Sequence, residues 1–226
     1  MKRFWTDVTI AEGAVLLDGR AIKTPMRAAF VLPSDALRKA VADEWRAVNE
    51  KINLHAMPMT GLANAAIDRI TPDASRFARD IAAYGETDVL CYRAEEPPEL
   101  AARQAAVWDP LLDWARRSYD IAFTVTTGIR HVRQPQEALT RLSAAVAERS
   151  AFELAALSPI ATIGGSLVVA LMLAEDAIAA GAAFDATHLD ELWQVELWGE
   201  DALAAGARAA RRADFISAAR FLNLLA

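Results

Sequence analysis

The stretch Leu154–Ala174, LAALSPIATIGGSLVVALMLA, decides between two classes of protein. It holds 21 residues without a charge, which is long enough for one helix to cross a bilayer. It also contains Ser158-Pro159, Thr162 and Gly164-Gly165, and it lacks the aromatic belts and the basic flank of membrane spans. Proline and glycine both interrupt helices, so we predict two short buried helices that break at Pro159 and at Gly164-Gly165. The stretch therefore predicts a protein core and no membrane insertion.

The composition of the whole chain is that of a folded, acidic protein. Of the 226 residues, 54% are hydrophobic and 24% are charged, which excludes a disordered chain. The net charge of −6 leaves no dominant basic surface, so we expect no nucleic-acid binding. The single cysteine, Cys91, cannot form an internal disulfide, and its apolar surroundings indicate a buried thiol rather than a nucleophile.

The first 33 residues have β-forming patterns. Val15–Leu17 and Ala21–Lys23 flank Asp18-Gly19, a pair that tolerates the positive φ of a tight hairpin turn. Phe30–Leu32 is expected to form another short strand, which Pro33 ends. The N-terminal region should therefore contain a β-hairpin.

Helical patterns dominate the rest of the chain. Ser34 is placed to cap a helix that runs to about Val48. Pro110 should kink or restart the long helix that contains it. The further helices are expected at Leu62–Ile70, Asp73–Tyr84, from Pro97-Pro98 past Trp114, Pro135–Arg149, Thr187–Trp198 and Ala202–Leu225. An extended connector is expected at Asp88–Arg93, and a loop or short strand at Thr124–Arg133.

This pattern predicts an α+β protein with two parts. Residues 1–55 should form a small N-terminal α/β domain with a hairpin and a helix. Residues 56–226 should form a larger all-helical C-terminal domain.

The sequence shows no arrangement of residues that supports catalysis or cofactor binding. It has no phosphate-binding loop and no nucleophile elbow, and its histidines and cysteine do not follow metal-ligand spacing. The one cluster of metal-ligand types is His188 with Asp190 and Glu191, which also fits a solvated first helical turn. We therefore expect no catalytic, cofactor or metal site. A small hydrolase that uses the carboxylates between Asp190 and Asp201 is the alternative.

Acidic residues are segregated toward the C-terminal third. Between Ser150 and Ala207 there is no lysine or arginine, and the nine acids are Glu153, Glu175, Asp176, Asp185, Asp190, Glu191, Glu196, Glu200 and Asp201. Such a patch can steer a basic partner surface, although acids also solvate helix ends.

Two residues of the predicted helix that ends at Trp198 depart from its helical pattern. On a helical wheel Glu196 falls inside the apolar arc, whereas Trp198 falls on the polar side. A buried carboxylate needs a partner, and an arginine of the last helix is expected to supply it. An exposed tryptophan is a typical interface anchor, although Trp198 could instead pack under Gly199 and the next helix. The predicted partner-binding residues are Asp190, Glu191, Gln194, Glu196, Trp198, Gly199, Glu200 and Asp201.

Six segments in this order resemble the family of ATP synthase assembly chaperones that bind the alpha subunit. They are Met57–Asn64, Thr87–Ala94, Trp108–Trp114, Gly165–Leu171, Leu192–Asp201 and Ala218–Leu222. The resemblance extends over nearly the whole chain, and Ala65 and Glu86 stand where the family is expected to have threonine and aspartate.

The resemblance implies a function that the composition does not show. Members of the family bind the free alpha subunit of F-type ATP synthase through its nucleotide-binding domain, prevent its aggregation and do not hydrolyse ATP. They are mitochondrial matrix proteins or belong to bacteria related to the mitochondrial ancestor. Because the chain shows no presequence, we expect a bacterial cytoplasmic member.

Overall fold

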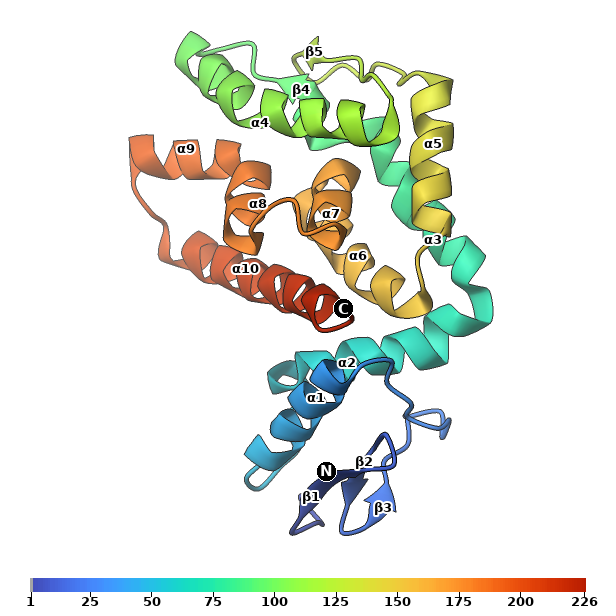
Figure 1. Ribbon diagram of the computed structural model, residues 1–226. Helices are drawn as coiled ribbons and strands as arrows, with labels where there is room; N and C mark the ends of the chain where they lie inside the picture. Colours follow the sequence, from blue (N-terminus) through green and yellow to red (C-terminus); the bar gives the residue numbers. More distant parts are fainter. Residues whose placement is uncertain (1) are drawn as a thin grey trace.

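The computed structural model describes residues 2–226, and its N-terminal part is a small antiparallel sheet (Figure 1). The sheet consists of β1 (Val8–Ala11), β2 (Ala14–Leu17) and β3 (Arg20–Ala21) in that order. Asp18 and Gly19, with φ of 48° and 77°, form the turn between β2 and β3. The hairpin predicted from this Asp-Gly pair is therefore confirmed.

The strand predicted at Phe30–Leu32 does not form. Phe30 and Leu32 are buried and Val31 is exposed, as in a strand, but the nearby pairing is limited to a single bridge between Lys23 and Ala29. The alternation of burial explains the prediction, whereas the absence of a neighbouring strand for these residues explains its failure.

The helix predicted after Ser34 is confirmed. The helix α1 (Asp35–Ala47) begins where the Ser34 side chain accepts a hydrogen bond from the Leu37 N–H. Leu37 and Val41 lie on its buried face, toward the sheet.

The remaining chain is mostly helical. From Pro58 to Thr87 it is almost continuously helical: α2 (Pro58–Ala65), a π turn (Ala66–Ile70), a 3-10 turn (Thr71–Asp73), α3 (Ala74–Ala82) and a 3-10 turn (Ala83–Thr87). The later helices are α4 (Pro98–Tyr119), α5 (Gln136–Ala147), α6 (Ala151–Gly164), α7 (Leu167–Ala174), α8 (Ala180–Thr187), α9 (Leu189–Trp198) and α10 (Ala202–Asn223). The connector predicted as extended contains a 3-10 turn (Val89–Cys91) and β4 (Tyr92–Arg93), which pairs in parallel with β5 (Thr126–Thr127).

The uncharged stretch is buried as two helices, α6 and α7, as predicted. They separate at Gly165, whose φ of 63° is left-handed and is readily adopted by glycine. The predicted break at Pro159 is wrong, because α6 continues through it, as α4 continues through Pro110. Packing of α6 against α10, α7 and α3 holds the helix where local propensity would end it. Within residues 2–226, no helix combines the length and the apolarity that a membrane span needs.

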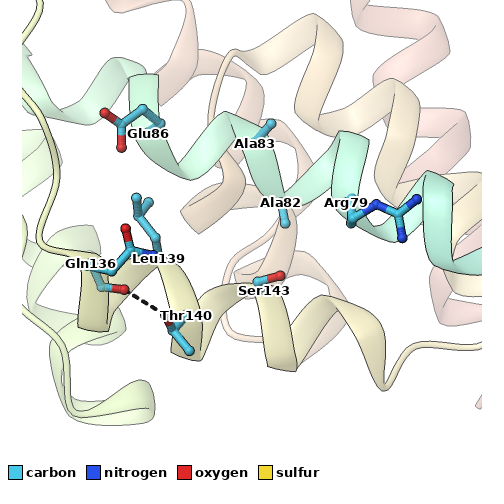
Figure 2. A pocket seen from close by; sticks show the side chains of 8 residues that line it. All are labelled: Arg79, Ala82, Ala83, Glu86, Gln136, Leu139, Thr140 and Ser143. Atoms are coloured by element: carbon cyan, nitrogen blue, oxygen red, sulfur yellow. Dashed lines mark hydrogen bonds between the residues drawn. The ribbon is translucent and has the colours of Figure 1, made fainter.

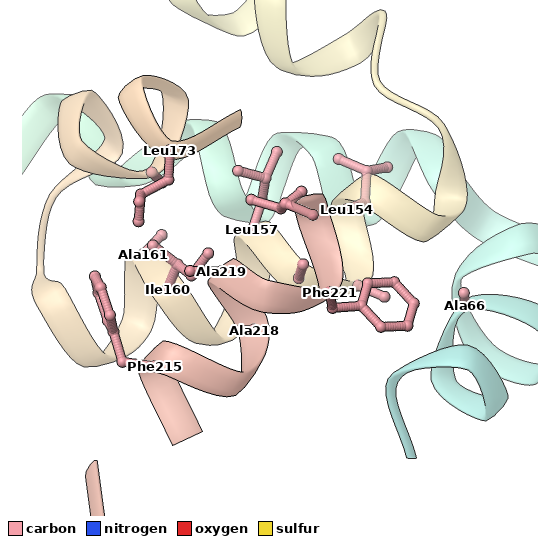
Figure 3. Close-up of a cluster of buried hydrophobic side chains, with 14 of the residues drawn as sticks. Ala66, Leu154, Leu157, Ile160, Ala161, Leu173, Phe215, Ala218, Ala219 and Phe221 are labelled. Carbon is pink, nitrogen blue, oxygen red and sulfur yellow. The ribbon is translucent and has the colours of Figure 1, made fainter. Parts of the chain in front are cut away.

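The core of the helical part lies where α10 crosses α6 (Figure 3). Phe215 and Phe221 of α10 are fully buried, and Figure 3 shows them on either side of Ala218 and Ala219. The two alanines let the helix axes approach closely. The α6–α10 pair therefore forms the centre of the core in the helical part.

The sheet and the helical part meet at the start of α2. The Glu44 carboxylate of α1 accepts hydrogen bonds from the Met59 and Thr60 N–H groups at 2.7 and 2.8 Å. Ser34 also donates a hydrogen bond to the Leu224 carbonyl at the C-terminus. We propose that residues 1–55 and 56–226 are the two structural units, which these bonds connect.

Candidate partner-binding surface

The helix α9 lies at the periphery, between α4 and α10 (Figure 1). Of its ten residues only Leu189 is buried, so few apolar contacts hold it to the core. Asp190 and Glu191 in its first turn favour the positive end of the helix. Gly199, with φ of 83°, ends it and turns the chain toward α10.

Polar contacts with α4 fix one side of α9. The Arg103 guanidinium of α4 donates two hydrogen bonds to the Glu196 carboxylate at 2.5 and 2.8 Å and lies over the Trp193 ring at 5.5 Å. Gln104 donates to Asp190 at 2.7 Å. The hydrogen bonds from Arg103 hold the pKa of Glu196 below its usual range.

The prediction that Glu196 points inward toward an arginine of the last helix is wrong. Glu196 is exposed, and its partner Arg103 comes from α4, 93 residues earlier. The wheel placed Glu196 in a broad buried arc, whereas α9 buries Leu189, half-buries Leu192, Trp193 and Val195, and leaves its last three residues exposed.

Arginines of the last helix neutralise other acids of the predicted surface. Arg211 contacts Glu191 at 2.7 Å and Arg208 contacts it at 3.3 Å. Arg208 also pairs with Glu200. The acidic stretch that the sequence shows as a block of uncompensated charge is therefore largely paired in three dimensions.

Apolar side chains are exposed where α9 passes into α10. Trp198 is 77% exposed, Leu197 55% and Leu203 86%. The outward position predicted for Trp198 is confirmed, and Leu203 is an exposed residue that the sequence interpretation missed. A signal existed, because Leu203 is a lone large apolar residue in an alanine-rich first turn. We call Leu197–Leu203 the α9 tip.

The remaining predicted residues of this surface have local roles or are simply exposed. The Asp201 carboxylate accepts a hydrogen bond from the Ala204 N–H at 2.9 Å and thereby caps α10. Gln194 and Gly199 are exposed. The predicted residues thus lie together on α9 and the α9 tip, where exposed apolar groups and ion pairs occur side by side in the chain.

The histidine beside this surface and the one cysteine have structural surroundings. His188 stacks on Phe184 with ring centroids 3.8 Å apart, and burial lowers its pKa. Among residues 2–226, no three histidine, cysteine or acidic side chains converge as metal ligands would. Cys91 is buried, and desolvation raises the pKa of its thiol. The thiol is therefore neither exposed nor activated.

A separate hollow of about 370 Å³ lies between α3 and α5 (Figure 2). Figure 2 shows Arg79 and Glu86 at opposite ends of the α3 side and Thr140 on α5. The Thr140 hydroxyl donates to the Gln136 carbonyl of its own helix, so it does not project a free polar group into the hollow. This hollow offers no convergent set of functional groups.

Comparisons with known proteins agree on one family. The sequence model of the ATP12 chaperone protein family matches residues 2–116 of this chain. The crystal structure of Atp12 from Paracoccus denitrificans is 39% identical, with a TM-score of 0.94 and coverage of 100% of this chain and 98% of that one. A mutant of P. denitrificans Atp12p gives 38% identity with the same TM-score and coverage. The Atu1473 protein from Agrobacterium tumefaciens is 39% identical with a TM-score of 0.94, over 100% of this chain and 86% of that one.

Proposed function

This chain belongs to the ATP12 chaperone family, and we propose from that premise that it binds the unassembled alpha subunit of F-type ATP synthase and prevents its aggregation. A subunit that awaits its neighbours exposes apolar surface, which is an aggregation hazard. A chaperone has to cover part of that surface and later give way to the true partner. Moderate affinity and a small apolar centre with a polar rim suit this task.

The exposed Trp198 ring is the observation that carries the proposal. Trp198 stands at the end of α9 with Leu197 and Leu203 near it in the chain, all more than half exposed. Tryptophan is enriched among the residues that dominate binding energy at protein interfaces. The ion pairs of Glu196 and Glu200 border these apolar groups, so the α9 tip has an apolar centre and a charged rim.

We propose further that the protein performs this task in the bacterial cytoplasm without catalysis. The carboxylates of the hydrolase alternative are engaged elsewhere: Glu191 and Glu200 in ion pairs, and Asp201 in the α10 cap. A holding chaperone needs no nucleotide, because assembly of the client supplies the driving force for release. The purified protein should therefore show no ATP turnover above a buffer blank.

Two pull-down experiments, one with the unassembled alpha subunit and one with the unassembled beta subunit, test the proposal. The immobilised full-length protein should retain alpha and not beta, and it should suppress light scattering by alpha as that subunit is diluted from denaturant. Retention of beta instead, or of neither subunit, would contradict the proposal.

A further inference from the structure

A second surface, away from the α9 tip, has the form of a ligand site. A groove of about 830 Å³ lies between the segment after β4, the loop after β5 and the first turn of α9. This volume is within the range of ligand-binding clefts. Val89, Ala94 and Ile129 supply apolar lining, and Ile129 is completely exposed.

The same groove carries acidic charge that the protein leaves uncompensated. Glu95, Glu96 and Asp190 line it, and within residues 2–226 none of the three forms an ion pair. By contrast, Glu191 and Glu196 of the neighbouring α9 face are paired with arginines. The unpaired negative charge of this region is therefore concentrated at the groove.

The lining also includes a buried cation with unused donors. Arg93 is 9% exposed, stacks on Trp108 at 5.1 Å and gives one guanidinium nitrogen to Asp109 at 2.7 Å. Its Nε and Nη1 have no acceptor within the described part of the chain. Both nitrogens are also shielded from solvent, so the guanidinium forms part of the groove floor and is held there by Asp109 and Trp108.

Backbone hydrogen bonds join the walls of the groove. The Val89 N–H donates to the Gly165 carbonyl at 2.9 Å, and the Gly128 N–H donates to the Arg93 carbonyl at 2.8 Å. Asp88, directly before Val89, is fully buried and accepts hydrogen bonds from Ser166 and Val168. These contacts tie three segments that are distant in sequence, so the groove exists before a ligand arrives and little ordering entropy is lost on binding.

We propose that this groove binds a peptide that carries both basic and apolar side chains. Basic groups would pair with Glu95, Glu96 and Asp190, and apolar groups would contact Val89 and Ile129. The proposal goes beyond the proposed function, because it requires neither the alpha subunit nor the α9 tip.

Fluorescence anisotropy with two labelled octapeptides tests the proposal on the full-length protein. One peptide alternates leucine and arginine, and its matched control alternates leucine and glutamate. We expect saturable binding of the basic peptide, at least about tenfold weaker binding of the acidic one, and weakening of the basic complex as salt rises.

Surface variants then locate the binding site. The double substitution Glu95→Lys with Glu96→Lys should weaken binding of the basic peptide about tenfold or more, and Ile129→Ser should weaken it about threefold or more. All three side chains are exposed, so folding should be unchanged. Glu12→Lys, an exposed acid on the β1–β2 turn, is the matched control and should have no effect.

Two results would refute the proposal that the groove binds the peptide. The first is equal binding of the basic and acidic peptides, or no binding of either. The second is weakening by Trp198→Ala but not by the groove variants, which would place the peptide at the α9 tip. If the wild-type protein binds the basic peptide but not the alpha subunit, only the proposed function is refuted. The two failures are therefore distinguishable.

Discussion

Replacement of Trp198 by alanine separates binding from folding. When fully covered, a tryptophan side chain buries about 150–250 Å². Because Trp198 is 77% exposed, about 120–190 Å² of its surface remains for a partner. At about 25 cal/mol per Å², covering this area corresponds to about 3–5 kcal/mol as an upper limit.

The measured loss should be smaller than this limit. Alanine retains part of the contact, and ordering of the interface offsets part of the gain. We expect Trp198→Ala to weaken alpha-subunit binding by about 1–3 kcal/mol, or about 5- to 150-fold in Kd. The part of the ring already covered is only about 35–60 Å², so the free energy of unfolding should fall by about 1.5 kcal/mol or less.

Isothermal titration with the alpha subunit and urea unfolding of each variant provide the two measurements. Leu54→Ala is the matched control, because Leu54 is 64% exposed and lies away from α9 in the 3-10 turn Leu54–Ala56. The control should leave the Kd for the alpha subunit and the free energy of unfolding nearly unchanged. If Trp198→Ala unfolded the protein, or bound alpha as well as the Leu54→Ala control does, the assignment of Trp198 as an anchor would be refuted.

Three further predictions follow from individual side chains. Glu196→Lys places a like charge opposite Arg103. Because both side chains are exposed, the melting temperature should change little, while alpha-subunit binding should weaken. A large loss of thermal stability would show that Glu196 is buried after all. Burial raises the pKa of Asp88 to about 6, above the 3.8 of the unfolded chain. The contribution of Asp88 to the free energy of unfolding is therefore fully present below about pH 4 and is lost as the pH rises to about 6. The stability of the wild type relative to Asp88→Asn should fall by about 2–3 kcal/mol over that interval, as measured by urea unfolding, and a difference independent of pH would contradict the assignment. Gly165→Ala should lower the free energy of unfolding by about 1 kcal/mol, because alanine is strained at a φ of 63°; an unchanged urea midpoint would contradict this.

Local signals were sufficient for part of the fold. The Asp18-Gly19 turn and the Ser34 cap depend on neighbouring residues alone, and both formed as predicted. The glycine at 165 also broke the helix as predicted, because its left-handed backbone is a local property. Features that depend on a few consecutive residues can therefore be read from the sequence directly.

Features that depend on distant contacts could not be predicted in this way. Pro159 has the same local effect in any sequence, but packing of α6 against α10 and α7 overrides it. Glu196 and Arg103 are 93 residues apart, and no periodicity of α9 indicates that α4 lies beside it. The exposure of Trp198 was predicted correctly because it follows from the position of this residue on the helical wheel. It misplaced Glu196 because the width of the buried strip depends on the neighbouring helices.

The way in which α9 is held bears on its proposed role. Leu189 is its one buried residue and Trp193 packs half-buried against the core, while ion pairs with Arg103, Arg208 and Arg211 tie it to the body. The pair of Glu196 with Arg103, in the second half of the helix, is exposed, so it stabilises weakly and is screened by salt. The α6–α10 core, by contrast, is closely packed, with Phe215 fully buried. A packed core that carries a peripheral helix with an exposed tryptophan at its end suits a chaperone, because a client can contact the exposed end without disturbing the core.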